Sequence, residues 1–351
     1  MEERKAMQNE ILEKYQIPDA NGLIANPGFA RNEILEYTRE NIKAPWFRKK
    51  EWDYYLFTNS DFAVAFTISD LGYIGLLSAS FIDLKTAKEH TESELAVFPK
   101  GKMFGLGTKV ADAHAECHTK RLNMVFNNVD GHRHISCDFK NFDGDKDLKC
   151  EIDVYEPKME AMYIATPWAE KPTAFYYNCK RNCLMAEGYV EYGDRKETMH
   201  MADTLGCLDW GRGVWTYDNT WFWGTGSGRI NGEAFGFNLG YGFSDRSSAS
   251  ENCLYYKDKI HKLDEVTFNI PKDEKGKYLF TQPWTITSND NRFVADFVPI
   301  LDRAAEMNYV LIISNQHQVF GKMTGTAVLD DGTKIEMKDY ICALEVVRNK
   351  Y

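Results

Sequence analysis

Two carboxylates in aromatic-rich sequence are the side chains best suited to acid–base chemistry. Asp209 and Arg212 lie in the segment Leu208-Asp-Trp-Gly-Arg-Gly-Val-Trp215, close enough in sequence for a charge pair, and Glu251 follows a polar turn further along. A carboxylate beside aromatic surface can have its pKa raised by desolvation and then act as a general acid or base. Asp209, Glu251 and Arg212 are therefore the predicted catalytic residues. The alternative is a purely structural Asp209–Arg212 pair that fixes a corner of the chain.

A predicted hairpin lies between these two carboxylates. The Asn231-Gly232 pair favours a type I′ turn, because both residues tolerate a positive φ. Such a turn places Trp223 opposite Gly240 and Trp221 opposite Gly242, so that each indole has space beside it for a small molecule. The alternative is that the glycines only relieve crowding in a core. The predicted ligand-binding residues are Trp210, Trp215, Trp221, Trp223, Thr225, Asn238 and Asn252.

Histidines and glycines elsewhere give weaker signals. On a strand, His114, Glu116 and His118 would share one face as a possible metal set, and the alternative is a solvated strand end. This choice stays open, and no metal ligand is assigned. The glycines of Gly224-Thr-Gly-Ser-Gly228 do not match a dinucleotide fingerprint, and no phosphate-binding loop occurs. We therefore expect no cofactor.

Strand and turn signals follow one another along most of the chain. Short runs rich in β-branched and aromatic residues, each bounded by turn residues, are typical of barrels or sandwiches. The clearest runs are Thr67–Leu84, Ala113–Phe139, Ala161–Tyr177 and Gly188–Met201. The Asp331-Gly332 pair predicts one more hairpin, between Thr326–Leu329 and Lys334–Met337.

Helical patterns are confined to the N-terminal region. One is expected over Met1–Ile17, ended by Pro18, and a second over Arg31–Ile42. The predicted fold is mainly β, with two barrel-like antiparallel halves and short N-terminal helices. We place the halves at residues 1–190 and 191–351, the first carrying the helices.

Composition limits the location and the partners of the protein. The 351 residues carry a net charge of −10 and form no long basic run, which argues against nucleic-acid binding. The N-terminus lacks the apolar core of a secretory signal, and Asp70 and Gly72 interrupt the most apolar stretch, Phe62–Leu84. We expect two buried strands joined by a turn at Asp70-Leu-Gly72 rather than a membrane span. The 8 cysteines form no CxxC pair, so we expect reduced, mostly buried thiols and a cytoplasmic protein.

Several segments resemble one protein family, the domain-of-unknown-function 2804 family. They are Ala186–Val190, Gly206–Trp215, Trp221–Gly224, Asn238–Phe243, Glu251-Asn252 and Thr326–Lys334. The family is more distantly similar to the lipocalin-like carotenoid hydratases, tocopherol cyclases and natural-product cyclases. That resemblance implies two β-barrel halves and apolar ligands, and it transfers no catalytic residue.

Three functions agree with these features. The first is a cofactor-independent hydratase, isomerase or cyclase, in which Asp209 or Glu251 supplies acid–base chemistry to an apolar or amphipathic small molecule. The second is a non-catalytic carrier of a lipid or metabolite in the same pocket. The third is a glycosidase that uses Asp209 and Glu251 as paired carboxylates. A small molecule is the only partner expected, and the sequence predicts no oligomeric state.

Overall fold

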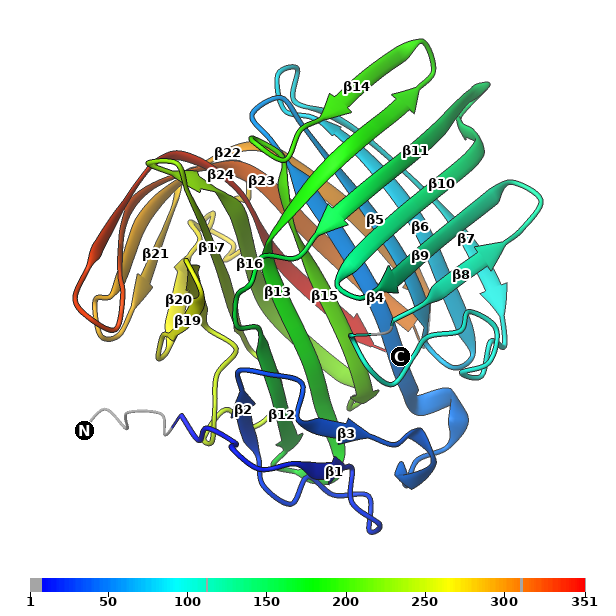
Figure 1. Cartoon of the computed structure of the whole chain (residues 1–351), viewed down its shortest axis with the longest axis vertical. Coiled ribbons are helices and arrows are strands. Elements are labelled where there is room, and N and C mark those ends of the chain that lie inside the picture. Colours follow the sequence, from blue (N-terminus) through cyan, green and yellow to red (C-terminus); the bar gives the residue numbers. More distant parts are fainter. Residues whose placement is uncertain (1–7, 112, 310–311, 351) are drawn as a thin grey trace.

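The computed structural model describes residues 8–350 except 112, 310 and 311, and these residues are almost entirely β-structure. Two curled antiparallel sheets form half-barrels, as Figure 1 shows. Helical geometry within the described residues is limited to two three-residue 3₁₀ turns, η1 (Arg39–Asn41) and η2 (Trp46–Arg48). The predicted mainly β fold is confirmed. None of the helices among the described residues is long and apolar enough to cross a membrane.

The first sheet contains thirteen strands of the described chain. Its main path runs in the order β7-β6-β5-β4-β15-β13-β11-β10-β9-β8, with β12, β14 and β2 attached at β13 and β12. The strands are β2 (Gly28–Ala30), β4 (Lys49–Thr58), β5 (Phe62–Asp70), β6 (Ile74–Asp83), β7 (Lys88–Val97), β8 (Ala115–His118), β9 (Leu122–Val129), β10 (His132–Asp143), β11 (Lys146–Tyr155), β12 (Met162–Trp168), β13 (Lys171–Tyr192), β14 (Arg195–Met199) and β15 (Leu205–Val214).

The second sheet contains nine strands of the described chain, in the order β19-β18-β17-β16-β24-β23-β22-β21-β20. They are β16 (Asp218–Ile230), β17 (Glu233–Tyr241), β18 (Cys253–Tyr256), β19 (Lys259–Lys262), β20 (Val266–Asn269), β21 (Trp284–Ser288), β22 (Phe293–Tyr309), β23 (Ile312–Val328) and β24 (Lys334–Lys350). The chain passes from the first sheet to the second between Val214 and Asp218. The predicted boundary at residues 190 and 191 falls inside β13, and a division into two domains stays a prediction.

The two sheets meet over a small apolar cluster, which we call the junction cluster. In Figure 1 the orange and red strands β22–β24 pass behind the blue strands β4 and β5. The fully buried members of the cluster come from both sheets and are Leu56, Ala63, Ala65, Ile82, Leu84, Cys207, Trp223, Leu301, Phe320 and Ala343. A larger apolar core lies mainly in the first half-barrel but includes Cys253, Tyr255 and Ile260 of the second sheet, and a further core lies in the second half-barrel.

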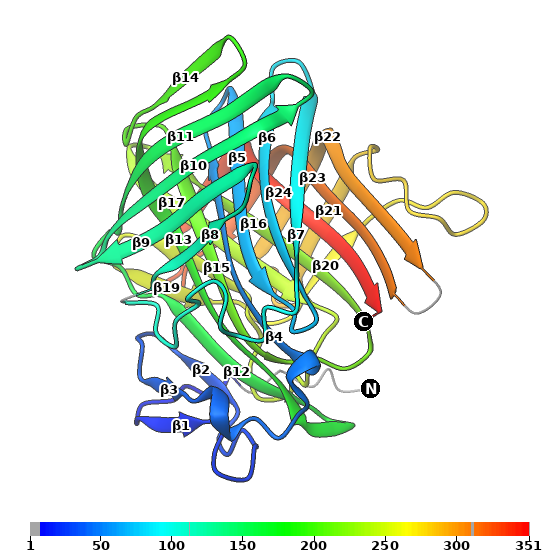
Figure 2. The same cartoon turned by 90° about the vertical axis from the view of Figure 1, so that its right-hand side faces the viewer.

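The predicted N-terminal helices are wrong. Tyr15–Ile17 is a strand, β1, that pairs in parallel with β3, Leu35–Tyr37. Between them, β2 pairs with β12 of the first sheet. The expected helix over Met1–Ile17 lies partly outside the described residues. Figure 2 shows this N-terminal segment below the first sheet, where pairing with distant strands overrides the local helical pattern.

Most of the predicted turns are confirmed. Strands β5 and β6 flank the Asp70-Leu-Gly72 turn, and Asp331-Gly332 closes the hairpin between β23 and β24. The Asn231-Gly232 hairpin has the predicted register, with Ile230 opposite Glu233 and Trp223 opposite Gly240. Both turn residues have positive φ, as a type I′ turn requires. All eight cysteines are buried free thiols, as expected.

Candidate active site

Asp209 lies on the central strand β15 and faces the second sheet. Its Oδ2 accepts a hydrogen bond from Lys180 Nζ at 2.6 Å. Its Oδ1 accepts from Asn178 Nδ2 at 2.7 Å and from Trp52 Nε1 at 3.2 Å. The indole of Trp52 lies against Gly211, where a Cβ atom would come within 2.1 Å of the ring. The Asp209 side chain keeps 15% of its surface exposed, so its carboxylate can meet a ligand.

Arg212 does not pair with Asp209, which corrects the prediction. Side chains three positions apart on a strand point to opposite faces of the sheet. Arg212 forms a fully buried ion pair with Asp53 at 2.9 Å on the far face of β15. Its guanidinium also lies 3.9 Å from the centre of the Trp210 ring, which is buried on that same face. Arg212 and Trp210 thus stabilise the core of the first half-barrel, away from Asp209.

Lys180, on β13, joins the two predicted carboxylates. Its Nζ lies 2.6 Å from Asp209 and 3.7 Å from Glu251, and it sits 5.0 Å from the centre of the Trp223 ring. Asp209 Oδ2 and Glu251 Oε2, the two oxygens that face Lys180 Nζ, are therefore no farther apart than the sum of these two distances. Burial alone would lower the pKa of Lys180, but the charges of Asp209 and Glu251 raise it above its usual value.

Glu251 lies deeper than Asp209 and is closed off from solvent. Its side chain is 2% exposed, and its Oε2 accepts a hydrogen bond from Tyr176 at 2.6 Å. The other oxygen, Oε1, is buried without a hydrogen-bond partner among the described residues. This oxygen lies over Gly240, where a Cβ atom would come within 1.7 Å of it. Burial, followed by the charge of Glu251, raises the pKa of Tyr176 well above its usual value, so Tyr176 stays a donor.

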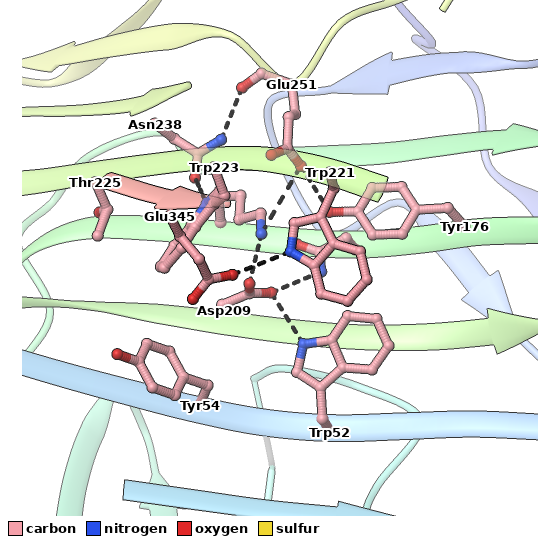
Figure 3. A network of polar contacts seen from close by, with 12 residues as sticks. Trp52, Tyr54, Tyr176, Asp209, Trp221, Trp223, Thr225, Asn238, Glu251 and Glu345 are labelled. Carbon is pink, nitrogen blue, oxygen red and sulfur yellow. Dashed lines mark hydrogen bonds and ion pairs between the residues drawn. The ribbon is translucent and has the colours of Figure 1, made fainter. Parts of the chain in front are cut away.

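Trp221 and Trp223 share one face of β16, as predicted. The Trp223 Nε1–H donates to Asn238 Oδ1 at 2.8 Å, and Asn238 donates in turn to the backbone oxygen of Glu251 at 3.0 Å. Trp221 Nε1–H donates to Glu345 Oε1 at 3.0 Å. The hairpin therefore carries Trp221, Trp223 and Asn238 into one hydrogen-bonded cluster with the carboxylates, drawn in Figure 3.

The free space predicted beside these indoles is filled by side chains. Trp223 is only 5% exposed, because Tyr54 packs edge-on against it at 5.9 Å and Glu251 occupies the place above Gly240. Two small pockets found in the described part of the protein border neither Trp221 nor Trp223. The glycines thus admit neighbouring side chains, which was the alternative interpretation.

Glu345, on β24, is a carboxylate that the sequence analysis missed. It lies opposite Trp223 on the neighbouring strand, and its Oε2 accepts a hydrogen bond from Gln318 Nε2 at 3.0 Å. Gln318 also contacts the hydroxyl of Tyr54 on the first sheet. Burial raises the pKa of Glu345 above its usual value, and the negative charge of Asp209 adds to this effect.

The remaining predicted residues have different surroundings. Trp215 packs 6.0 Å from Trp52 and 5.3 Å from Trp221, so it supports the aromatic side of the cluster. Thr225 accepts a hydrogen bond from Asn182 at 2.8 Å. Asn252 is held by backbone groups, accepting from the Gly240 N–H and donating to the Asp264 oxygen. Thr225 and Asn252 therefore hold strands together in this structure.

One of the missed residues has a sequence signal. Glu345 is a single charged residue inside otherwise apolar strand sequence, Ile341-Cys-Ala-Leu-Glu345, whereas Lys180 is followed directly by Arg181 and does not stand out. A buried charge is costly unless it is paired, so a lone charge in such a run indicates a partner from elsewhere in the fold. Trp52, Tyr54, Tyr176, Asn178 and Gln318 carried no comparable signal.

The histidines near β8 form a separate, exposed group. His114 and His118 both face Glu116, at 3.4 and 3.2 Å. Across the described residues, no three His, Cys, Asp or Glu side chains are grouped so as to hold a metal ion. These three side chains lie on the exposed side of their segment. In sequence, this segment is far from the strands that carry the Asp209 cluster.

The fold and the cluster together define a class, a mainly β protein of two antiparallel half-barrels with ionisable and aromatic side chains at their junction. Within this class the chain belongs to the family described as "Domain of unknown function (DUF2804)", whose sequence profile matches residues 8–351. The predicted resemblance to this family is confirmed. A search of the curated proteins finds no significant match.

Two solved structures with low sequence identity align with almost the whole chain. The crystal structure of CghA with Sch210972 is 10% identical, with a TM-score of 0.50, and the alignment covers 99% of this chain and 97% of that one. Kievitone hydratase from Nectria haematococca is 11% identical, with a TM-score of 0.45 and coverage of 99% and 97%. At these identities the similarity shows the fold alone.

Proposed function

We propose that the protein is an acid–base enzyme of the hydratase type, which acts without a cofactor on an apolar or amphipathic small molecule. One observation carries the proposal: Asp209 and Glu345 approach each other from the two sheets, close enough for the charge of one to shift the pKa of the other. Paired titratable groups in different environments are typical of acid–base sites. A cytoplasmic location, where buried thiols stay reduced, is part of the proposal.

The surroundings of the pair favour an apolar substrate. Trp52, Tyr54 and Trp221 are half-buried, as are Asp209 and Glu345, so each presents part of its surface to solvent. Flat aromatic surface with a few placed polar groups suits ring systems and conjugated chains. CghA, which has the same fold, has been crystallised with Sch210972, and this supports ligand binding by the architecture.

Hydration of a carbon–carbon double bond divides naturally between the two carboxyl groups. Glu345, whose pKa is raised by burial, gives its proton to one carbon. Asp209 accepts a proton from a water molecule, whose oxygen bonds to the other carbon. The π bond is lost, one C–H and one C–O bond form, and both protons are accounted for. The reverse sequence removes water from an alcohol.

The Asp209–Glu251 pair is less suited to glycoside cleavage. Lys180 lies between the two carboxylates, whereas a glycosidase needs that space for the sugar. Glu251 is also shut off from solvent beneath Tyr176. These contacts support Asp209 with Glu345, rather than with Glu251, as the reacting pair.

The test is turnover in isotopically labelled water. The purified protein is incubated in H₂¹⁸O with a panel of unsaturated phenolic and terpenoid compounds and their hydrated forms, and mass spectrometry detects gain of labelled water by the former and loss of unlabelled water or exchange of label by the latter. Asp209→Asn and Glu345→Gln should each lower the rate at least about a hundredfold, whereas the exposed-carboxylate control Glu274→Gln should not. Binding of panel compounds without any label exchange would instead support a carrier.

A further inference from the structure

A row of side chains crosses the second sheet and ends at the guanidinium of Arg303. Arg303 on β22 lies opposite Gln318 on β23, Gln318 lies opposite Glu345 on β24, and Glu345 lies opposite Trp223 on β16. Directly opposed residues project from the same face of a sheet. The row faces the first sheet, because Arg303 Nη1 donates a hydrogen bond to Ser80 Oγ on β6 at 2.6 Å.

Arg303 is held in place but has few partners. It is half-buried, and Ser80, its single hydrogen-bond acceptor among the described residues, is fixed by a hydrogen bond from Thr91 at 2.9 Å. No carboxylate of the described chain lies within ion-pair distance of its guanidinium, although the neighbouring Asp302 pairs with His317. A guanidinium has five N–H donors in a planar fork that suits a carboxylate or similar anion. Most of these donors are left for a ligand.

The charge of Arg303 is directed at the candidate active site. Burial raises the pKa of Tyr54 and of Glu345, and in both cases the positive charge of Arg303 counteracts part of that rise. The guanidinium is therefore within electrostatic reach of the proposed acid Glu345 and of an aromatic ring beside it. A ligand lying along the half-buried ring of Tyr54 would reach both groups, whereas Gln318 itself is buried.

We propose that Arg303 anchors an acidic group of the substrate, so that the substrate is an apolar or aromatic molecule with one carboxylate or acidic phenol. This inference rests on the proposed function. Neighbouring strands are about 4.8 Å apart, so the two strand steps from Arg303 to Glu345 span about 10 Å. The acidic group would thus lie roughly 10 Å from the reacting bond. A bidentate contact would fix that separation and the orientation of the molecule.

The experiment compares two dyes that share an aromatic skeleton. Anilinonaphthalene sulfonate carries an acidic group, and phenylnaphthylamine lacks it; fluorescence titration measures the dissociation constant of each. The wild-type protein should prefer the anionic dye. Arg303→Met should weaken binding of the anionic dye about tenfold, as expected for the loss of a charge-assisted contact, and leave the neutral dye unchanged. Arg303→Lys should retain part of the preference.

A matched control addresses the other aromatic surface on which a dye could bind. Lys100 lies over Trp46 and Phe98 at 4.9 and 5.8 Å, and both rings are exposed. Lys100→Met should leave the ratio of the two dissociation constants as it is. Circular dichroism of Arg303→Met and Arg303→Lys checks that both variants fold.

Two results would overturn the anchor. One is a wild-type protein without preference for the anionic dye, and the other is an equal loss of both dyes on changing Arg303, which would mean a structural role. Dye binding needs no turnover, so its outcome is separate from that of the labelled-water assay. Label exchange without a dye preference would contradict only the anchoring role of Arg303. A dye preference without label exchange would contradict only the proposed enzymatic activity.

Discussion

Lys180 is the residue on which the buried charges of the site depend. Its side chain is 4% exposed and contacts Asp209 and Glu251. Removing one partner of a buried ion pair leaves an uncompensated charge, which costs far more than losing a surface pair. Here one ammonium pairs with two carboxylates, so its removal leaves both negative charges uncompensated.

The first prediction concerns this ammonium. Lys180→Met should lower the free energy of unfolding by about 3–5 kcal/mol, measured by urea denaturation at neutral pH. Lys196→Met is the matched control, because Lys196 pairs with Glu191 in an exposed setting. The control should cost much less, because an exposed ion pair is screened by solvent.

Neutralising the carboxylates tests the cause of the loss. Adding Asp209→Asn and Glu251→Gln to Lys180→Met should restore part of the stability, since no unpaired charge then remains. If Lys180→Met costs no more than Lys196→Met, the ion pairs do not hold the site together.

At the scale of the residue, one side of the site was predictable from the sequence. Asp209, Glu251, Trp221, Trp223 and Asn238 do belong to one cluster, as the hydrogen bonds show. Arg212 was misplaced because nearness in sequence was given more weight than strand alternation. The partners of Asp209 and Trp221 lie far away in sequence, on β13, β4 and β24, and no local pattern identifies them.

At the scale of the element, the hairpin of β16 and β17 was predictable from its turn over Phe222–Tyr241. A two-residue turn fixes the register of both strands, and every cross-strand pair follows from it. The N-terminal strands were not predictable in the same way. Their pairing partners include β12, more than a third of the chain away in the first sheet, so tertiary contacts decide their conformation.

The second prediction tests whether the Glu251 carboxylate leaves room for a side chain at position 240 of this hairpin. Gly240→Ala should lower the free energy of unfolding by about 1–3 kcal/mol, because its methyl group would overlap the buried carboxylate. Gly228→Ala, in the same hairpin, is the control, since its methyl group would come no nearer than 3.1 Å to the Tyr340 ring. Chemical denaturation of both variants gives the comparison.

A double-mutant cycle identifies the carboxylate as the obstacle. Combined with Glu251→Ala, the Gly240→Ala change should cost less than it does alone, by about 0.5 kcal/mol or more. Additive effects would show that Gly240 is needed for another reason. Equal costs for Gly240→Ala and Gly228→Ala would also contradict the close contact between Gly240 and the Glu251 carboxylate.

At the scale of the whole molecule, the site exists only where the two half-barrels meet. Lys180 and Asp209 belong to the first sheet, and Trp221 and Glu345 belong to the second. The junction cluster beneath them draws side chains from both sheets. Composition and strand spacing predicted two β halves, but their relative placement depends on long-range packing that no local signal encodes. Stability of the whole fold is therefore a condition for the chemistry proposed.

Buried thiols and phenols are distributed through both halves and make that stability depend on pH. Burial raises the pKa of Cys117, Cys179 and Cys207 to about 12 and that of Cys253 to about 11. It also raises the pKa of Tyr55 to about 12. Unfolded, such groups titrate near about 8.5 for cysteine and about 10 for tyrosine. The folded protein therefore keeps protons that the unfolded chain releases.

The last prediction follows from that difference. A raised pKa in the folded state contributes stability that is fully present below the unfolded pKa and is lost as the pH rises. The free energy of unfolding should thus fall from about pH 8.5 upward and more steeply above about pH 10, by up to about 1.4 kcal/mol per pH unit for each such group. Urea titrations at a series of pH values, with reductant present, measure this slope. Cys342→Ala should make it shallower, because burial raises the pKa of that thiol as well. Leu344→Ala, on the same strand and equally buried, should lower stability at every pH without changing the slope. A stability that stays constant between about pH 8 and 11 would show that these groups are not held protonated by the fold.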